Sequence, residues 1–250
     1  MRSVLCLAAM AALVIGCGPS SSSGEDGGAS PFANSLRHVF PPVYLDVGEE
    51  VADVCQSWTL NNEEPLYVNA VRQTNEGGWH HSNWTFGPEE VFDGPDGTWN
   101  CDDRGYALQF AVAAGGVLFA QSTQAFEETQ SFAEGAVLVI PPHSRIVGNI
   151  HLINFTGAPI DNSLNMELGV IPEEEVRVKL RPIGMFNTRI AADAYAESRF
   201  SMNCDLESYF KNTLKVDTMP EFKIYYVLGH YHAWGNYLNL SYVHADGSER

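Results

Sequence analysis

The chain has 250 residues, of which 45% are hydrophobic and 18% are charged. This is an ordinary globular composition with enough apolar mass for one large domain or two small ones. Lys and Arg total 14 against 31 Asp and Glu, a formal net charge of -17, which argues against a nucleic-acid surface that works by neutralising phosphates.

The N-terminus has the parts of an export signal. Arg2 supplies a positive charge, residues 4–15 form an apolar run too short to span a bilayer, and Gly16 precedes Cys17. The ending LVIGC resembles a bacterial lipobox, which predicts a signal peptide over 1–16 and a lipid on Cys17 that anchors the chain to the cell envelope, with the outer membrane favoured. Plain secretory cleavage is the alternative. The Gly- and Ser-rich residues 17–35 are predicted to form a flexible tether.

Short runs of alternating apolar and polar residues, bounded by Gly, Pro, Asn and Asp, recur through the rest of the chain. They predict strands at 51–60, 65–74, 106–114, 135–141, 144–156, 174–182, 185–196 and 222–243. The pattern is typical of an all-β, antiparallel β-sandwich protein.

A seam near Pro182 divides the chain into predicted domains at 36–182 and 183–250. The second is expected to be incomplete, because alone it would form a thin sheet with unpaired edges.

Export places Cys55, Cys101 and Cys204 in an oxidising compartment, where most cysteines are paired. Three is an odd number, so one cysteine is free or its partner is absent.

Histidine is the residue type whose pattern suggests chemistry, and the eight histidines lie at positions 38, 80, 81, 143, 151, 230, 232 and 244. In a strand over 222–243, His230 and His232 project to the same side, where one metal ion can bind both. Imidazole suits copper and zinc, but two nitrogens require a third ligand from elsewhere. The alternative is two core rings whose N–H groups donate to backbone carbonyls.

The adjacent His80 and His81 would point to opposite faces of a regular strand. Both can bind one ion only where the backbone is irregular, and Gly77 and Gly78 supply such a bend. His151 lies in an apolar strand, where a hydrogen-bonded core histidine is the common alternative to a ligand. The histidines at 38, 143 and 244 are interpreted as surface or structural residues.

The order WHH (79–81), a single strand histidine (His151), then HYH (230–232), in an exported all-β chain, resembles the copper type II, ascorbate-dependent monooxygenases, which include the peptidylglycine α-hydroxylating and dopamine β-hydroxylating enzymes. The resemblance implies two jelly-roll-like antiparallel β-sandwich domains, the second incomplete. It implies that His80, His81 and His151 bind an electron-storing copper, and that His230 and His232 belong to an oxygen-activating copper.

The same resemblance implies a disulfide between Cys55 and Cys101, and gives Cys204 a partner beyond the H-x-H motif. The family's second copper also takes a methionine after that motif, whereas none of the 18 residues after His232 is Met. The second site is therefore expected to be incomplete and oxygen activation impaired.

The reaction that the resemblance implies inserts one oxygen atom of O₂ into a C–H bond of a peptide, an amine or another small molecule, with ascorbate as reductant. The alternative is a non-catalytic surface lipoprotein that binds copper, another ion or a ligand. A purely structural lipoprotein requires that both histidine motifs arise by coincidence.

Overall fold

The computed structural model describes residues 9–12, 30–121, 125–187, 190–212, 215–218, 222–229, 237–244 and 246–249. The chain divides into two compact units. The larger unit comprises Leu13–Ile183 and Lys223–Val227, and the smaller unit comprises Met1–Ala12, Gly184–Phe222 and Leu228–Arg250. The assignment of 36–182 and 183–250 as two copper-binding domains stays a prediction.

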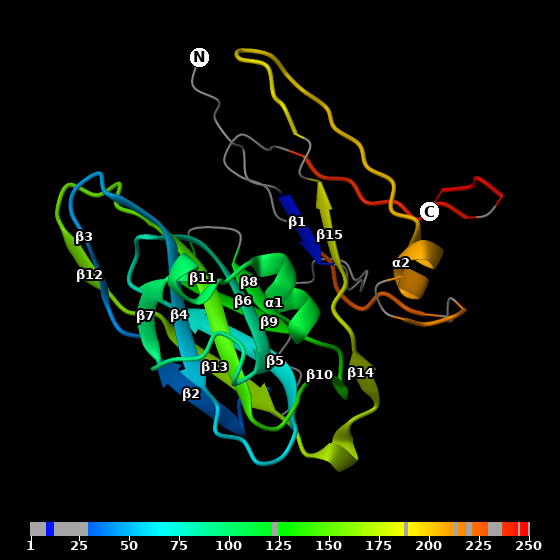
Figure 1. The fold of residues 1–250 in the computed structure, drawn as a ribbon, viewed down its shortest axis with the longest axis horizontal. Helices are drawn as coiled ribbons and strands as arrows, with labels where there is room; N and C mark the ends of the chain where they lie inside the picture. The colour runs from blue at the N-terminus through cyan, green and yellow to red at the C-terminus, as the bar shows by residue number, and fades with distance from the viewer. Residues whose placement is uncertain are drawn as a thin grey trace. The chain divides into compact units, whose positions relative to one another are not determined.

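The larger unit is built mainly of β-strands (Figure 1). Its described strands are β2 (Ser35–Val39), β3 (Val43–Leu45), β4 (Glu50–Thr59), β5 (Leu66–Thr74), β6 (Trp79–Pro88), β7 (Gly97–Asn100), β8 (Gly116–Gln121), β9 (Glu127–Ser131), β10 (Ala136–Ile140), β11 (Ser144–Ile153), β12 (Ile160–Asn162), β13 (Asn165–Val170) and β14 (Val178–Leu180).

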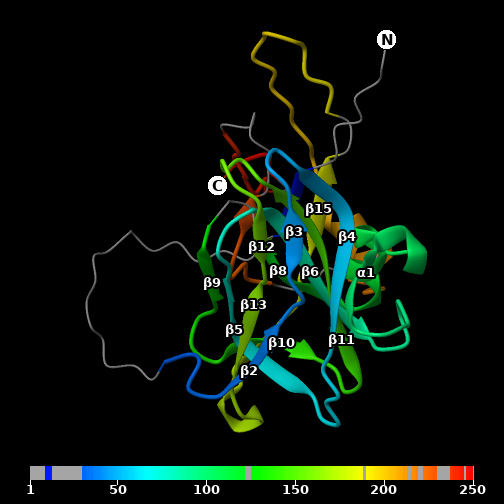
Figure 2. The ribbon, with the colours of Figure 1, turned by 90° about the vertical axis from the view of Figure 1, so that its left-hand side faces the viewer.

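These strands form two large sheets and one small one. The first sheet has the order β14-β10-β5-β13-β2, with β9 also paired to β5, and the second has the order β7-β4-β11-β6-β8. The pairs within them are antiparallel except for β10 with β14. Strands β3 and β12 pair with each other and run side by side at one end of the larger unit (Figures 1 and 2).

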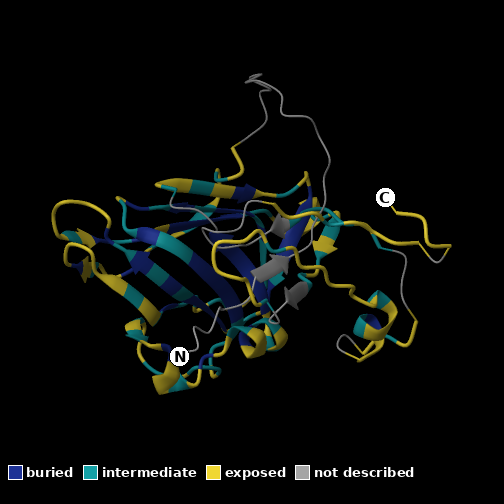
Figure 3. Ribbon diagram, turned by 90° about the horizontal axis from the view of Figure 1, so that it is seen from above, coloured by how far each residue is buried: buried dark blue, intermediate teal, exposed yellow. Residues whose placement is uncertain are grey.

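The two large sheets share one hydrophobic core, and buried residues concentrate in their strands (Figure 3). The first sheet contributes Val68, Val71, Leu138, Ile140, Met166 and Leu168, and the second contributes Trp79, Trp84, Phe86, Leu118, Phe119, Ile146, Ile150 and Leu152. Burial of this apolar area is the main favourable term in folding the unit. The sequence-based expectation of a mostly β, antiparallel protein is confirmed, while the jelly-roll arrangement stays a prediction.

Four predicted strands match observed ones closely. The runs at 51–60, 65–74, 135–141 and 144–156 correspond to β4, β5, β10 and β11. The run at 174–182 holds only β14, preceded by the short 3-10 helix η2 (Glu173–Glu175). The strands of the larger unit that were not predicted are β2, β3, β6, β7, β8, β9, β12 and β13, and β6 carries the H-H motif.

The prediction of a strand at 106–114 is wrong. These residues contain the helix α1 (Leu108–Ala114), which follows the 3-10 helix η1 (Cys101–Arg104) and lies against β6 and β8 (Figure 1). Leu, Gln and Ala favour helix more than strand. Ala111 is buried in one apolar cluster with Cys55 and Cys101, and Leu108 packs against this cluster, so a helical face, not an alternating one, is buried here.

The smaller unit contains a three-stranded antiparallel sheet in the order β15-β1-β16, made from β15 (Gly184–Asn187), β1 (Ala9–Ala12) and β16 (Leu228–Gly229), and the helix α2 (Leu206–Asn212). Strand β1 lies within the predicted signal peptide, whose removal stays a prediction. None of the described helices has the length and hydropathy to span a membrane.

Two long strands predicted for this part of the chain are wrong in extent. The run at 185–196 is a strand only as far as Asn187 among its described residues, and the described part of 222–243 is regular strand only at Leu228 and Gly229. Alternation makes a strand only where a partner strand offers hydrogen bonds. Among the described residues, β1 pairs with β16 at Ala11 and Ala12.

Candidate metal centre

Two neighbouring histidines reach the same side of β6 because the strand carries a β-bulge. In the antiparallel pair of β6 and β11, His81 lies opposite His151 while Trp79 lies opposite Leu152, so His80 is an extra residue. Trp79 and Leu152 both face the buried core. Because the extra residue restores the inward orientation of Trp79, His80 and His81 together occupy the outer side next to His151.

The turn before the bulge depends on glycine. Gly77 and Gly78 have φ angles of 123° and 78°, which side chains on L-residues rarely permit. At Gly78 an added Cβ would also lie 2.3 Å from Ile160 Cδ1, and the Gly78 carbonyl accepts a hydrogen bond from the Ile153 amide at 2.8 Å. The expected irregular backbone at the H-H motif is confirmed, with the extra residue just after the two glycines.

The three rings form one compact group. The ligand nitrogens of His80, His81 and His151 all lie within 4.8 Å of one another, and all three residues are half-buried. The ring centroids of His80 lie 5.2 Å from those of both other rings, and the rings of His81 and His151 are 4.7 Å apart and nearly perpendicular at 84°. Such a set of convergent imidazole nitrogens could hold a metal ion.

His151 contacts a group on each side of its ring. Its Nδ1 lies 2.9 Å from His81 Nε2, and its Nε2 lies 2.6 Å from Glu50 Oε1. The alternating burial of β11 places His151 on the outer face of the sheet and Ile150 and Leu152 in the core. His151 is therefore not a core residue, although its ring is hydrogen-bonded, and its role as a metal ligand stays a prediction.

A second register shift places Glu50 beside His151. In the pair of β4 and β11, Ile150 lies opposite Val54 and Leu152 opposite Val51, so Ala52 and Asp53 together oppose His151. Asp53 adopts a φ of 58°, which accommodates the extra residue.

The shift decides which residue of β4 meets the ring. It places Glu50 opposite Ile153, on the outer face that His151 also occupies, while Val51 packs against the core. No feature of the sequence marked Glu50 as part of the site.

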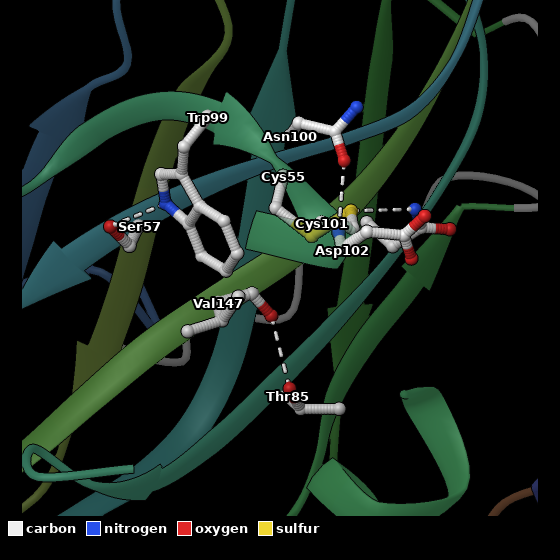
Figure 4. Close-up of a disulfide and its surroundings, with 9 residues drawn as sticks. Cys55, Ser57, Thr85, Trp99, Asn100, Cys101, Asp102 and Val147 are labelled. Atoms are coloured by element: carbon white, nitrogen blue, oxygen red, sulfur yellow. Dashed lines mark hydrogen bonds between the residues drawn. A yellow bond between two sulfur atoms is a disulfide. The ribbon is translucent and has the colours of Figure 1, made fainter. Parts of the chain in front are cut away.

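A disulfide joins Cys55 to Cys101 (Figure 4). Cys55 lies opposite Asn149 in the pairing of β4 with β11, and Asn149 donates a hydrogen bond from Nδ2 to Cys101 Sγ at 3.3 Å. Since Asn149 and His151 are two residues apart on one strand, the disulfide covers the same outer face. The expected pairing is confirmed, and among the described residues Cys204 is a free, exposed thiol.

The surroundings of the disulfide are well packed and hydrogen-bonded. Trp99 donates from Nε1 to Ser57 Oγ at 3.1 Å, and Thr85 Oγ1 donates to the Val147 carbonyl at 3.1 Å (Figure 4). Burial raises the pKa of the nearby Tyr106 phenol to about 12, so this hydroxyl stays neutral at physiological pH.

The remaining described histidines do not join the group. His38 stacks on Trp58 with ring centroids 4.8 Å apart, and burial lowers its pKa more than the nearby Asp96 raises it. His143 is an exposed turn residue with a φ of 52°, and His244 is exposed. These positions fit the surface or structural roles expected for them.

His230, His232 and the predicted lipidation site Cys17 lie outside the described residues, so their roles stay predictions.

The three imidazole groups restrict which metal ions could bind, but they do not identify one ion. Three imidazoles suit zinc, copper and other transition ions, and they suit calcium and magnesium poorly because those prefer oxygen.

No protein-family model matches the chain, and no curated protein shows significant similarity to it.

Proposed function

We propose that the protein is a copper-binding, exported lipoprotein related in chemistry to the copper type II, ascorbate-dependent monooxygenases. In this proposal His80, His81 and His151 hold the electron-storing copper, and His230 and His232 contribute to the oxygen-activating copper. The observation that carries the proposal is the bulge that brings the adjacent His80 and His81 against His151 of the next strand. This is the ligand order that the resemblance to the family implies.

The choice of copper rests on the chemistry of the donors. Bound copper would supply one-electron redox chemistry, which zinc cannot do, and imidazole accommodates both of its oxidation states. The half-buried rings of the group would hold the ion at the outer face of the sheet. The overall reaction would convert a C–H bond, O₂ and ascorbate into an alcohol, water and dehydroascorbate.

The disulfide supports the same proposal. Cys55 and Cys101 pair at the positions that the resemblance implies, one before and one after the H-H motif. Cross-linking β4 to the segment after β7 stabilises the face that carries the histidines. The jelly-roll connection of the sheets and attachment of Cys17 to the outer membrane belong to the same proposal.

A second candidate is a non-catalytic lipoprotein that binds one metal ion. It is supported by the group of His80, His81 and His151, which could hold one metal ion by itself. Such a protein would sequester copper without turnover.

Metal stoichiometry separates the two candidates. The purified protein is loaded with copper, desalted and analysed for metal content, and O₂ uptake is followed with ascorbate. The monooxygenase proposal expects two coppers, of which His151→Ala removes one and His230→Ala the other, more weakly bound one, together with ascorbate-dependent O₂ uptake that is slow because the second site is expected to be incomplete. One copper that only His151→Ala removes, without O₂ uptake, supports the second candidate. His143→Ala is the control, and loss of copper there would contradict the ligand assignment.

A further inference from the structure

We propose that Glu50 is a positioning residue for the histidine group, because its carboxylate fixes the tautomer of His151 and leaves Nδ1 as the atom that binds metal. The inference rests on the proposed metal site and adds a residue to it.

The contacts of His151 indicate which of its two ring nitrogens carries the hydrogen. A carboxylate can only accept a hydrogen bond, so at the 2.6 Å separation of His151 Nε2 and Glu50 Oε1 the ring nitrogen is the donor. A neutral imidazole with its hydrogen on Nε2 has its lone pair on Nδ1. That Nδ1 atom is the one that faces His81, at 2.9 Å from its Nε2.

The β-bulge in β4 determines which face of the sheet Glu50 occupies. Without the extra residue in β4, continuing the pairing of Ile150 with Val54 would place Val51 opposite Ile153 and turn Glu50 to the other face. The bulge instead puts Glu50 beside the ring and Val51 against the core. A fixed backbone feature, rather than a chance surface contact, therefore presents this carboxylate.

The side chains of His151 and Glu50 differ in how far they are exposed to solvent. The His151 side chain is only 17% exposed whereas that of Glu50 is 60% exposed, so the carboxylate caps the ring from the solvent side. Carboxylates that accept the second N–H of a metal-binding histidine orient the ring and raise its basicity, and their loss typically weakens metal binding by about 10-fold to 100-fold.

In the metal-free protein, the tautomer of His151 also determines the direction of its hydrogen bond with His81. If His151 Nδ1 has the lone pair, the short contact to His81 is a hydrogen bond in which His81 Nε2–H donates. A metal ion that takes both nitrogens must displace this hydrogen. The metal-free tautomers are therefore part of the test.

The first measurement uses the metal-free protein. Long-range ¹H–¹⁵N NMR reports which ring nitrogen of each histidine carries hydrogen. We expect the Nε2–H tautomer at His151 in the wild-type protein, a mixture of tautomers in Glu50→Ala, and the wild-type pattern in Glu50→Gln, whose amide oxygen can still accept. Hydrogen on His151 Nδ1 in the wild-type protein would overturn the inference.

The second measurement is the affinity for copper(I), in competition with a chromophoric chelator. We expect Glu50→Ala to bind about 10-fold to 100-fold more weakly than wild type and Glu50→Gln to recover most of the loss. Glu63→Ala is the matched control, because Glu63 lies 3.8 Å from a histidine outside the group, His143. An affinity of Glu50→Ala within twofold of wild type, with an unchanged unfolding midpoint, would overturn the inference.

The two measurements separate this inference from the proposed function. A wild-type protein that shows the expected tautomer but binds no copper would refute the proposed metal site and leave the hydrogen-bond assignment standing. A wild-type protein that binds copper equally well with and without Glu50 would refute only the role of Glu50.

Discussion

His81 lies directly opposite His151 in the pairing of β6 with β11, and each strand that flanks β11 presents two residues to this one position. On β6 these are His80 and His81, and on β4 they are Ala52 and Asp53. Bulges are frequent next to functional sites because they redirect side chains. Two of them at a single residue make His151 the centre of the group.

The glycine that precedes the first bulge gives a direct test of this backbone. We expect Gly78→Ala to lower the free energy of unfolding by about 2–3 kcal/mol, because the positive φ is unfavourable for Ala and the new Cβ crowds Ile160 Cδ1. The end of the Ile160 side chain must shift, and the buried Leu45 Cδ1 also lies 3.3 Å from the new Cβ. Urea denaturation measures the change, and the affinity for copper should fall with it.

Gly48→Ala is the matched control. Gly48 has a similar φ of 75° but nothing within 4 Å of an added Cβ, so its cost should be the backbone term alone, about 1 kcal/mol. Equal destabilisation by the two substitutions would show that the contact with Ile160 is unimportant.

Part of the candidate site could be predicted from the sequence, and part of it could not. The grouping of His80, His81 and His151 was expected from the resemblance to the copper monooxygenases, and the adjacent glycines indicated that the backbone could bend at the H-H motif. The position of Glu50 was not, because it depends on the register of β4 against β11. A one-residue shift of register changes which face every side chain occupies, and no local pattern records it.

The secondary structure was likewise predicted only in part from the sequence. Strands with clear alternation, such as β4 and β5, were predicted within one or two residues. In β8 every residue is buried, so there is no alternation to detect. In α1 helix propensity and packing beside the disulfide outweigh a pattern that only resembles a strand.

The disulfide should contribute strongly to stability. Cys55 and Cys101 are 46 residues apart, and a cross-link of this length stabilises by about 4 kcal/mol on the chain-entropy model. We expect the double substitution Cys55→Ala and Cys101→Ala to lower the free energy of unfolding by about this amount in urea. Cys204→Ala, which removes an exposed free thiol, should change it by less than about 0.5 kcal/mol. A double variant as stable as wild type would contradict the prediction.

Lipidation can be tested through the cysteine of the lipobox. We expect Cys17→Ser to move the protein from the membrane fraction to the soluble fraction of a bacterial host that exports it, because the proposed anchor requires the thiol. Fractionation followed by immunoblotting measures the change. Cys6→Ser, within the apolar run of the signal, should leave the protein with the membranes. A wild-type protein found in the soluble fraction would instead favour plain secretory cleavage.

Glu167 links three strands of the first sheet through its carboxylate. It lies opposite Arg37 of β2 and Arg72 of β5, and it accepts hydrogen bonds from both and from Ser35 Oγ, the last at 2.7 Å. Burial by itself raises the pKa of this carboxyl, but the hydrogen bonds favour the charged form more strongly, and the pKa ends below its ordinary value.

This arrangement predicts a pH-dependent loss of stability in Glu167→Gln. A carboxyl whose pKa is depressed by folding contributes stability above its unfolded pKa of about 4.3, and that contribution is lost as the pH falls through the folded pKa. We therefore expect the variant to be less stable than wild type by about 2 kcal/mol at pH 7, because Arg37 and Arg72 lose charge-assisted hydrogen bonds to a buried carboxylate while their own side chains remain accessible to water. The difference should shrink steadily below about pH 4. Glu134→Gln, whose ion pair with Arg177 is exposed at both ends, should cost less than about 1 kcal/mol in the same urea titrations. A difference that stays constant between pH 7 and pH 3 would show that Glu167 acts through packing instead of charge.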